Sequence, residues 1–386
     1  MINVAVIWAN LGPYHFARAR ALCQVPGLAP VFVELAAQER LHPWEMDKGI
    51  LSARVITLMD AVYEQCPPYE LTRRLTAQLS ALAPDVVVVA GYGEVPMRAA
   101  ARWSKAHGKA SIVMFESTQW DHPRKWWKEW PKSLFIRRYF DAGFTGGLSH
   151  TQYLHALGMP WERIWEKLSV VDNDYFANAS AAARDKAVDL RRRYHLPERY
   201  FLYIGRFAPE KNLLRLLEAY QEYRLASDDP WGLVLVGDGL QNAELLQRAA
   251  ALQLKDVVWA GFQQVQELPV YYGLSSCFVL PSTMEPWGLV VNEAMACGVP
   301  IVASKRCGCV LDLVKDGENG FTFSPEDVPA LARNLAQVAS LSEAQRTALG
   351  QRSREIIAGY TLDVWAQQLA ACVRATIARH PRKVKA

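Results

Sequence analysis

Short, mostly apolar runs alternate along the chain with longer stretches that have the spacing of amphipathic helices. Strands that are buried on both faces and separated by helices are typical of a parallel sheet covered by helices. We therefore predict an α/β unit in the first half of the chain, with strands at residues 4–9, 31–35, 55–58, 86–90 and 112–115 and a Phe-Thr pair near residue 144.

A second series of apolar runs predicts a second α/β unit, with strands at residues 200–204, 233–236, 257–259, 277–280 and 300–303. A polar joint with little helical character, Val171-Asp172-Asn173-Asp174-Tyr175-Phe176, separates the two series, and we interpret its acids as structural rather than metal-binding. The expected domains are 1–172 and 173–361. A C-terminal helix and basic tail at 362–386 could pack back on the first domain.

Composition agrees with a two-domain globular protein. The chain has 386 residues, of which 51% are hydrophobic and 21% charged, and its net charge is +4. This excess is too small to predict a nucleic-acid partner. The first residues read as a strand rather than a leader peptide, and no apolar run reaches the 18 residues of a membrane span.

The seven cysteines form no CxxC pair, so neither a disulfide framework nor a zinc site is predicted. A reducing compartment fits this pattern best. We therefore expect a cytoplasmic protein without a bound metal.

The most informative loops follow the strands of the second unit. Arg206 and Lys211 stand five residues apart after the strand at 200–204 and before a helix. A helix N-terminus offers free amide donors, Arg supplies a planar fork and Lys a point charge, so this loop suits a diphosphate. The Gly-Lys-Ser/Thr ending of a Walker loop is absent. Two solvated surface cations are the alternative.

Two acids flank a second loop. Glu285 precedes a helix and Glu293 lies within it, and eight residues of helix span about 12 Å. Gly288 lets the backbone approach a ligand closely at the helix start. Acids beside an anion-attracting helix end make sense if they hold hydroxyl groups. The alternative is that both acids only cap or pair within their own domain.

Several motifs between about residues 200 and 325 carry a family resemblance. They are Gly205-Arg206, Lys211-Asn212, Gly237-Asp238-Gly239, Pro281-Ser282, Glu285 and Glu293 separated by seven residues, Gly298, Pro300 and Asp316-Gly317-Glu318-Asn319-Gly320. In order and spacing they resemble the donor domain of retaining glycosyltransferases of family 4. The resemblance implies the GT-B fold, in which two Rossmann-like, doubly wound α/β domains face each other across a cleft.

The resemblance also implies roles for individual residues. Arg206 and Lys211 would grip the diphosphate of the donor, Glu285 would contact the transferred sugar, and Glu293 would hold the ribose. The backbone of Trp287, Gly288 and Leu289 would line the sugar and phosphate pocket.

The first domain matches the family less explicitly. Members often have two glycines after the first strand, whereas Gly12 stands alone in Asn10-Leu11-Gly12-Pro13. Many members also have a His near the reacting carbon, after a later strand of this domain. Glu116, Asp121 or His122 could take a related place, and we name Glu116 and His122 as catalytic candidates beside Glu285. Retention relaxes the need for an enzyme base, since the departing phosphate can accept the acceptor's proton.

Residues 124–140 have the most unusual composition in the chain. Six cations and the single acid Glu129 are interleaved with aromatic residues. This mixture suits an anionic membrane surface, although single-stranded nucleic acid or inward packing of the aromatics would also account for it.

We therefore expect a retaining, metal-independent hexosyltransferase of polysaccharide, lipopolysaccharide or glycoconjugate synthesis. It would use a nucleoside diphosphate sugar as co-substrate, no cofactor, and a carbohydrate or lipid-linked acceptor, at the inner face of the membrane. A nucleotide-sugar epimerase of similar fold and a non-catalytic nucleotide-sugar binding protein are the alternatives.

Overall fold

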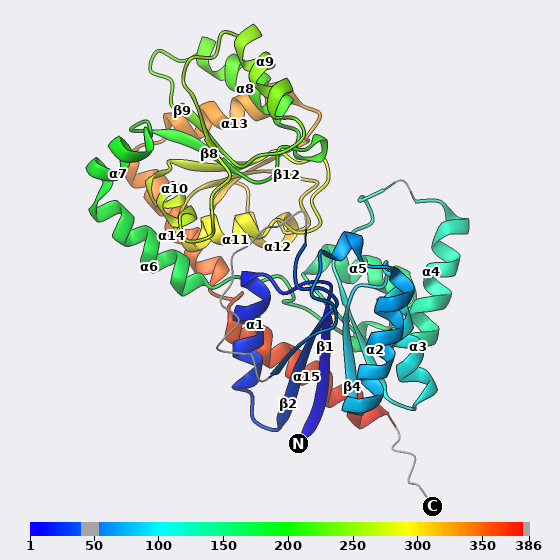
Figure 1. Ribbon diagram of the computed structural model, residues 1–386. Coiled ribbons are helices and arrows are strands. Elements are labelled where there is room, and N and C mark those ends of the chain that lie inside the picture. Colours follow the sequence, from blue (N-terminus) through cyan, green and yellow to red (C-terminus); the bar gives the residue numbers. More distant parts are fainter. Residues whose placement is uncertain (40–53, 123, 381–386) are drawn as a thin grey trace, which may run out of the picture. The chain divides into compact units, whose positions relative to one another are not determined.

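The computed structural model describes residues 1–39, 54–122 and 124–380, so the basic tail expected at 381–386 lies outside the described residues. The chain forms two compact units (Figure 1). Unit 1 comprises Met1–Val170 together with Leu362–Ala386, and unit 2 comprises Val171–Thr361. The boundary expected after residue 172 lies two residues from the observed one.

Unit 1 contains a seven-stranded sheet in the order β3-β2-β1-β4-β5-β6-β7, and every strand pair in it is parallel. The order reverses between β1 and β4, which lie side by side although two strands separate them in sequence. The strands are β1 (Ile2–Trp8), β2 (Leu28–Glu34), β3 (Val55–Thr57), β4 (Val86–Ala90), β5 (Ala110–Phe115), β6 (Ala142–Thr145) and β7 (Ile164–Trp165).

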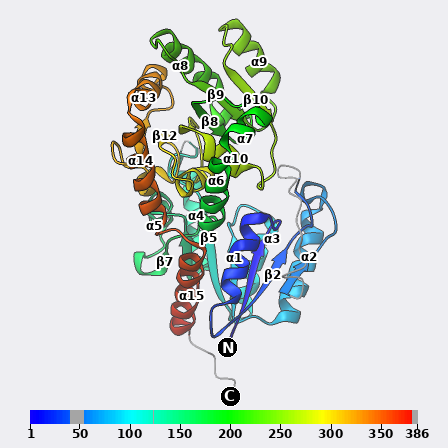
Figure 2. The same ribbon diagram turned by 90° about the vertical axis from the view of Figure 1, so that its left-hand side faces the viewer.

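Helices cover both faces of this sheet. The C-terminal helix α15 packs beside α1 on one face, and α2 and α3 lie on the other (Figures 1 and 2). The core on the side of α2 and α3 includes Leu75 and Met97 from these helices, Ile136 from α4 and Leu154 from α5. The helices are α1 (Pro13–Cys23), α2 (Pro68–Leu82), α3 (Val95–Ala106), α4 (Trp126–Tyr139), α5 (Leu148–Ala156) and α15 (Leu362–Arg379).

Unit 2 repeats the plan with six parallel strands in the order β10-β9-β8-β11-β12-β13. Here the order reverses between β8 and β11. The strands are β8 (Tyr200–Ile204), β9 (Gly232–Val236), β10 (Val257–Gly261), β11 (Cys277–Leu280), β12 (Ile301–Ser304) and β13 (Gly320–Phe323).

The helices of unit 2 also form two layers. One layer pairs α8 with α13, and the other pairs α10 with α6 and α11 with α14 (Figure 1). They are α6 (Asn173–Asp185), α7 (Ala187–Tyr194), α8 (Leu213–Leu225), α9 (Asn242–Ala251), α10 (Leu268–Leu274), α11 (Leu289–Ala296), α12 (Val310–Leu313), α13 (Val328–Ser340) and α14 (Glu343–Ile357).

The predicted architecture of two parallel, helix-covered sheets is confirmed. The interpretation of residues 171–176 as a joint poor in helix is wrong, because α6 begins at Asn173. Asp172 caps this helix by accepting a hydrogen bond from the amide of Tyr175 at 3.0 Å. Asn173 donates to the carbonyl of Ile357 at 3.1 Å and thereby ties α6 to the end of α14. Both polar residues therefore have local structural partners.

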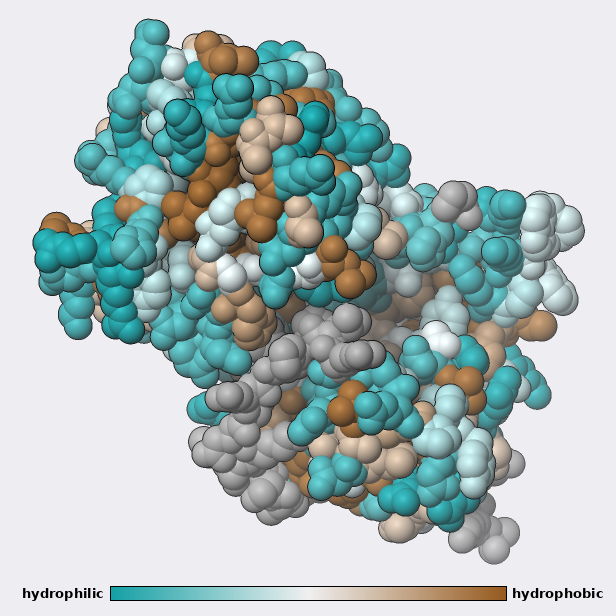
Figure 3. Space-filling view, turned by 45° about the horizontal axis from the view of Figure 1, so that its top comes forward, coloured by the Kyte–Doolittle hydropathy of each residue, from teal (hydrophilic) through white to brown (hydrophobic). Residues whose placement is uncertain are grey.

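The surface and the interior differ as expected for a globular chain. Hydrophilic side chains cover most of the face shown in Figure 3, and apolar ones appear in scattered groups. All seven cysteines are free thiols, and every one except Cys23 is buried. Within the described residues, no helix has the length and apolar character that crossing a membrane requires.

Candidate active site

The polar loops of unit 2 meet where its strand order reverses. Residues 205–212 leave the carboxyl end of β8, and residues 281–288 leave the carboxyl end of β11, the neighbouring strand. Such a switch point is the usual ligand position in an open α/β sheet, because the two connections diverge to opposite faces and leave a crevice. The fold thus brings Lys211 against Glu285, with Arg206 in the same loop as Lys211.

The loop after β8 is held by buried contacts on both sides. Asn212 adopts a left-handed backbone conformation at φ 60° and is buried. Its side-chain amide donates to the carbonyl of Pro281 at 3.0 Å and to that of Pro325 at 2.9 Å. The amide of Thr283 donates to the carbonyl of Glu210 at 2.8 Å. These bonds fix the two loops to each other.

Two glycines allow a third loop to pack against the first. Gly237 has φ 141°, and a Cβ atom there would lie 1.9 Å from the carbonyl oxygen of Gly205. Gly239 has φ 159°, and its Cβ would lie 2.4 Å from the carbonyl oxygen of Phe207. A side chain at either position would collide with backbone, so only glycine lets these loops approach so closely.

Lys211 and Glu285 form the central ion pair of the site. The ammonium group donates to Oε2 of Glu285, and the side chains are only 13% and 10% exposed. Ser282 donates to the same carboxylate oxygen at 3.2 Å. Burial, with Glu285 nearby, raises the pKa of the Tyr203 phenol beneath the loops. A buried charge pair whose carboxylate accepts a second hydrogen bond is a preorganised polar group of the kind that binds ligands.

The segment after Glu285 leads directly into α11. The carbonyls of Glu285 and Trp287 accept hydrogen bonds from the amides of Gly308 at 3.0 Å and Cys309 at 3.2 Å. Gly288 precedes α11 with φ 95°, a conformation that favours glycine. Leu289 then starts the helix. The chain therefore presents the N-terminus of an eight-residue helix beside the ion pair.

Trp287 contributes backbone rather than side chain to this region. Its indole is buried and donates to Oδ1 of Asn292 at 2.8 Å. Glu293 is also buried and accepts a hydrogen bond from the hydroxyl of Tyr272 at 2.8 Å. Arg206 is 43% exposed and pairs with Glu210 at 3.0 Å. Arg206, Lys211 and Glu285 thus follow the carboxyl ends of β8 and β11, whereas Glu293 lies within α11 and has a separate partner.

In unit 1, Gly12 lies at the switch point between β1 and β4. Its amide donates to Nδ1 of His15 at 3.1 Å, and Pro13 at the next position has no amide hydrogen. The amide of Leu11 donates to Oε2 of the fully buried Glu34 at 3.1 Å. The two amides directly before α1 therefore donate to side chains of β2 and of α1 itself.

The catalytic candidates of unit 1 occupy different surroundings. Glu116 follows β5, and its Oε1 accepts a hydrogen bond from Ser169 at 2.7 Å. The buried guanidinium of Arg18 donates to the carbonyl of Val170 at 2.7 Å. Burial lowers the pKa of Arg18, and the nearby Glu116 opposes that shift. His122 lies on an exposed turn.

Sequence reasoning missed several residues that shape these loops. They are Arg18, Glu34, Glu210 and Tyr272. The one visible signal was Glu34, a carboxylate inside an apolar strand run, because a buried acid requires hydrogen-bond partners.

Residues 190–356 match the family described as glycosyl transferases group 1. An alpha-D-kanosaminyltransferase of Streptomyces kanamyceticus is 31% identical over 218 residues, which are 56% of this chain and 55% of that protein. A GDP-mannose-dependent phosphatidylinositol monomannoside mannosyltransferase of Mycolicibacterium smegmatis is 31% identical over 50% of each chain. The chain thus spans about half the length of the curated relatives it matches.

The likeness in structure extends over both units. The Anabaena protein HepE, solved with UDP, superposes with a TM-score of 0.75 over 97% of this chain and all of its own, at 16% identity. A sucrose-phosphate synthase from Thermosynechococcus elongatus gives a TM-score of 0.73 over 98% of this chain and all of its own, at 18% identity. The chain has the GT-B fold. The residues that match group 1 glycosyl transferases, 190–356, all lie in unit 2.

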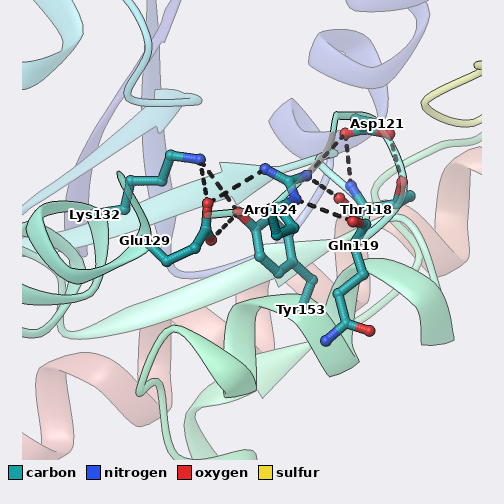
Figure 4. Close-up of polar contacts among 7 residues, drawn as sticks. All are labelled: Thr118, Gln119, Asp121, Arg124, Glu129, Lys132 and Tyr153. Atoms are coloured by element: carbon teal, nitrogen blue, oxygen red, sulfur yellow. Dashed lines mark hydrogen bonds and ion pairs between the residues drawn. The ribbon is translucent and has the colours of Figure 1, made fainter. Parts of the chain in front are cut away.

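Unit 1 contains a polar network at the start of α4 (Figure 4). Glu129 accepts hydrogen bonds from the hydroxyl of Tyr153 at 2.6 Å and from Lys132 at 2.8 Å. The guanidinium of Arg124 lies 4.3 Å from the centroid of the Tyr153 ring and 3.7 Å from Glu129. It also donates to the carbonyl of Gln119 at 3.0 Å. These contacts attach the turn before α4 to α5.

We expect Glu129→Gln to destabilise unit 1 by about 1–3 kcal/mol at neutral pH, since it replaces the charged acceptor of two hydrogen bonds with a neutral one. Burial raises the pKa of Glu129, but the bonds from Lys132 and Tyr153 outweigh this and leave it lowered. A lowered pKa in the folded state adds stability above the unfolded-state pKa and loses it as pH falls through the folded value. Urea unfolding at pH 7 and pH 3 measures the difference.

The control is Glu318→Gln, which breaks an exposed pair with Arg352 and should change little. Equal unfolding midpoints of the Glu129 variant and the wild type at pH 7 would contradict the assignment. So would a deficit that is as large at pH 3 as at pH 7.

Proposed function

We propose that the protein is a retaining glycosyltransferase that moves a hexose from a nucleoside diphosphate sugar to a carbohydrate or lipid-linked acceptor. The observation that carries this proposal is the buried pair of Lys211 with Glu285 at the switch point of unit 2, within the segment that matches group 1 glycosyl transferases. The donor would be a co-substrate, and we propose no bound metal or cofactor.

The donor's diphosphate would lie between Arg206, Lys211 and the start of α11. Arg206 is accessible and Lys211 is nearby, so two positive charges and the helix N-terminus would face the phosphate oxygens. Gly288 would let the backbone of Trp287 and Leu289 approach the ligand. HepE was solved with UDP and with UDP-glucose, which supports a nucleotide sugar as donor.

Glu285 would then be free to act on the sugar. Once phosphates attract Lys211, the carboxylate can accept hydrogen bonds from hexose hydroxyls and stabilise positive charge that develops at the reacting carbon. Glu293, buried further along α11, is proposed to hold the ribose. Retention leaves the acceptor's proton to the departing phosphate, with Glu116 and His122 as candidates for assistance from unit 1.

The names of relatives support a glycoconjugate acceptor. They include the phosphatidylinositol monomannoside mannosyltransferase and a lipopolysaccharide 1,2-N-acetylglucosaminetransferase of Salmonella typhimurium. We therefore propose an acceptor of glycan or glycolipid type and a cytoplasmic location at the membrane's inner face. An epimerase would instead release an altered free nucleotide sugar, and a binding protein would leave the donor unchanged.

We expect Arg206→Ala to weaken binding of the nucleoside diphosphate about 10- to 100-fold, since one charge-assisted contact is worth about 1.5–3 kcal/mol. Lys211→Ala should weaken it too, but that variant also leaves Glu285 without its cation. Titration calorimetry with UDP and GDP, on the wild type and each variant, measures this.

Arg199→Ala is the matched control, because Arg199 lies at the opposite end of β8 and pairs with Asp229. Unchanged affinity in both the Arg206 and the Lys211 variants would place the phosphates elsewhere. A panel of nucleotide sugars, first ranked by thermal shift, then separates the alternatives by product. A glycoside formed with an added acceptor supports transfer, and an epimerised free donor contradicts it.

A further inference from the structure

Helix α4 has apolar side chains on two sides, and only one of them faces the core. Ile136 is fully buried, and the ring of Phe135 lies 6.1 Å from that of Tyr92. Ile136 and Phe140 belong to the core of unit 1, and Phe135 and Tyr92 pack against it. The interpretation of the segment's aromatics as inward packing is therefore correct for its second half.

The other side of α4 carries large apolar residues in solvent. The exposed fractions are 78% for Trp126, 54% for Trp127, 66% for Trp130 and 55% for Leu134. At 3.6 residues per turn, positions spaced 0, 1, 4 and 8 fall on one side of a helix. Three indoles and a leucine side by side in water are an exposed apolar surface that the fold of this chain does not bury. We call these four residues the α4 outer face.

The polar network at the start of α4 engages two of the six cations of residues 124–140 and leaves the other four exposed. Arg124 and Lys132 are used internally by Tyr153 and Glu129 (Figure 4). The sequence alone did not separate these two cations from the other four. The other four are exposed: Lys125 directly before α4, and Lys128, Arg137 and Arg138 on the helix.

Acidic side chains are scarce around this surface. Glu129 is the only acid of α4, and it turns inward to Lys132 and Tyr153. Residues 95–160 contain ten Lys and Arg against four Asp and Glu, whereas the rest of the chain has 33 against 35. The positive excess of the whole protein is therefore concentrated in the segment that contains α4.

We propose that the α4 outer face and the four exposed cations of residues 124–140 bind the surface of an anionic phospholipid bilayer. Indole rings settle at the level of the lipid headgroups, leucine enters the acyl boundary, and Lys and Arg meet phosphate groups. A soluble polyanion would pair with the cations but would leave Leu134 exposed to water. This surface belongs to unit 1 and does not depend on the proposed glycosyl transfer.

The test is co-sedimentation of the full chain with vesicles of phosphatidylcholine alone or with one quarter phosphatidylglycerol. We expect binding to the anionic vesicles at 50 mM salt and much weaker binding at 500 mM, because screening shortens the reach of the charges. Each cation contributes about fivefold in partitioning, so Lys125→Glu with Lys128→Glu should weaken binding at least about 25-fold. Lys132 stays unchanged because its role is internal.

The apolar contribution is tested separately with Trp126→Ala and Trp130→Ala in one variant. Both side chains are mostly in solvent, so the fold should persist, and a thermal melt verifies it. We expect this variant to bind anionic vesicles more weakly than the wild type at both 50 mM and 500 mM salt. We also expect brominated lipid to quench less of its tryptophan fluorescence. The controls lie in unit 2: Lys255→Glu with Arg333→Glu for charge, and Leu225→Ala with Leu240→Ala for exposed apolar residues.

Three results would overturn the proposal. The wild type could fail to bind anionic vesicles at 50 mM salt, or the α4 variants could bind as well as the unit 2 controls. The third is binding of a single-stranded oligonucleotide under conditions where vesicles are not bound, which would assign the surface to nucleic acid.

Discussion

Glu285→Gln is expected to lower turnover by about 10²-fold or more, the size of effect that follows removal of one preorganised electrostatic group. The amide has nearly the same shape as the carboxylate and can still accept the hydrogen bond from Ser282. It cannot carry the negative charge that opposes positive charge at the reacting sugar carbon. The initial rate of transfer, measured with saturating donor, reports this loss.

The same substitution should preserve binding of the free diphosphate, because Lys211 loses a competing partner and becomes fully available to phosphate. Titration calorimetry therefore distinguishes a defect in chemistry from a collapsed site. Glu210→Gln is the matched control, since Glu210 pairs with Arg206 in the same loops and has no proposed contact with the hexose. Wild-type turnover in the Glu285 variant would refute its assignment.

Gly237→Ala is expected to lower the free energy of unfolding of unit 2 more than a substitution at an exposed position would. The left-handed-type φ of 141° costs about 1–3 kcal/mol in a residue with a side chain. The collision of the new Cβ with the carbonyl oxygen of Gly205 adds about 1–3 kcal/mol of overpacking. We expect a lower urea midpoint together with weaker diphosphate binding, because the displaced loop carries Arg206.

Gly261→Ala separates the two causes. Gly261 has φ 68°, but a Cβ atom there would meet nothing within 4 Å. This control should show only the backbone strain and keep the affinity for diphosphate. If the two alanine variants are equally stable and bind equally well, close packing of the 205 and 237 loops is not what holds the site.

The sequence by itself determined the fold class and the composition of the loops that follow β8 and β11. Apolar runs separated by helical stretches define parallel strands locally, and α15 appears at residues 362–379 as the pattern predicts. Strands β7 and β13 were not predicted, because two to four half-buried residues at a sheet edge give too short a signal. Arg206, Lys211 and Glu285 were found because charged residues directly after apolar strands are visible in the sequence.

Only the tertiary structure decided which of these residues are partners. Lys211 and Glu285 are 74 positions apart and pair because β8 and β11 are neighbours, an order that local patterns do not encode. In the same way, Glu129 and Tyr153 meet only after α4 and α5 pack on one sheet face, and this contact separates internal from exposed cations. Periodicity specifies which residues face a core, whereas the partners of buried charges depend on contacts between segments distant in sequence.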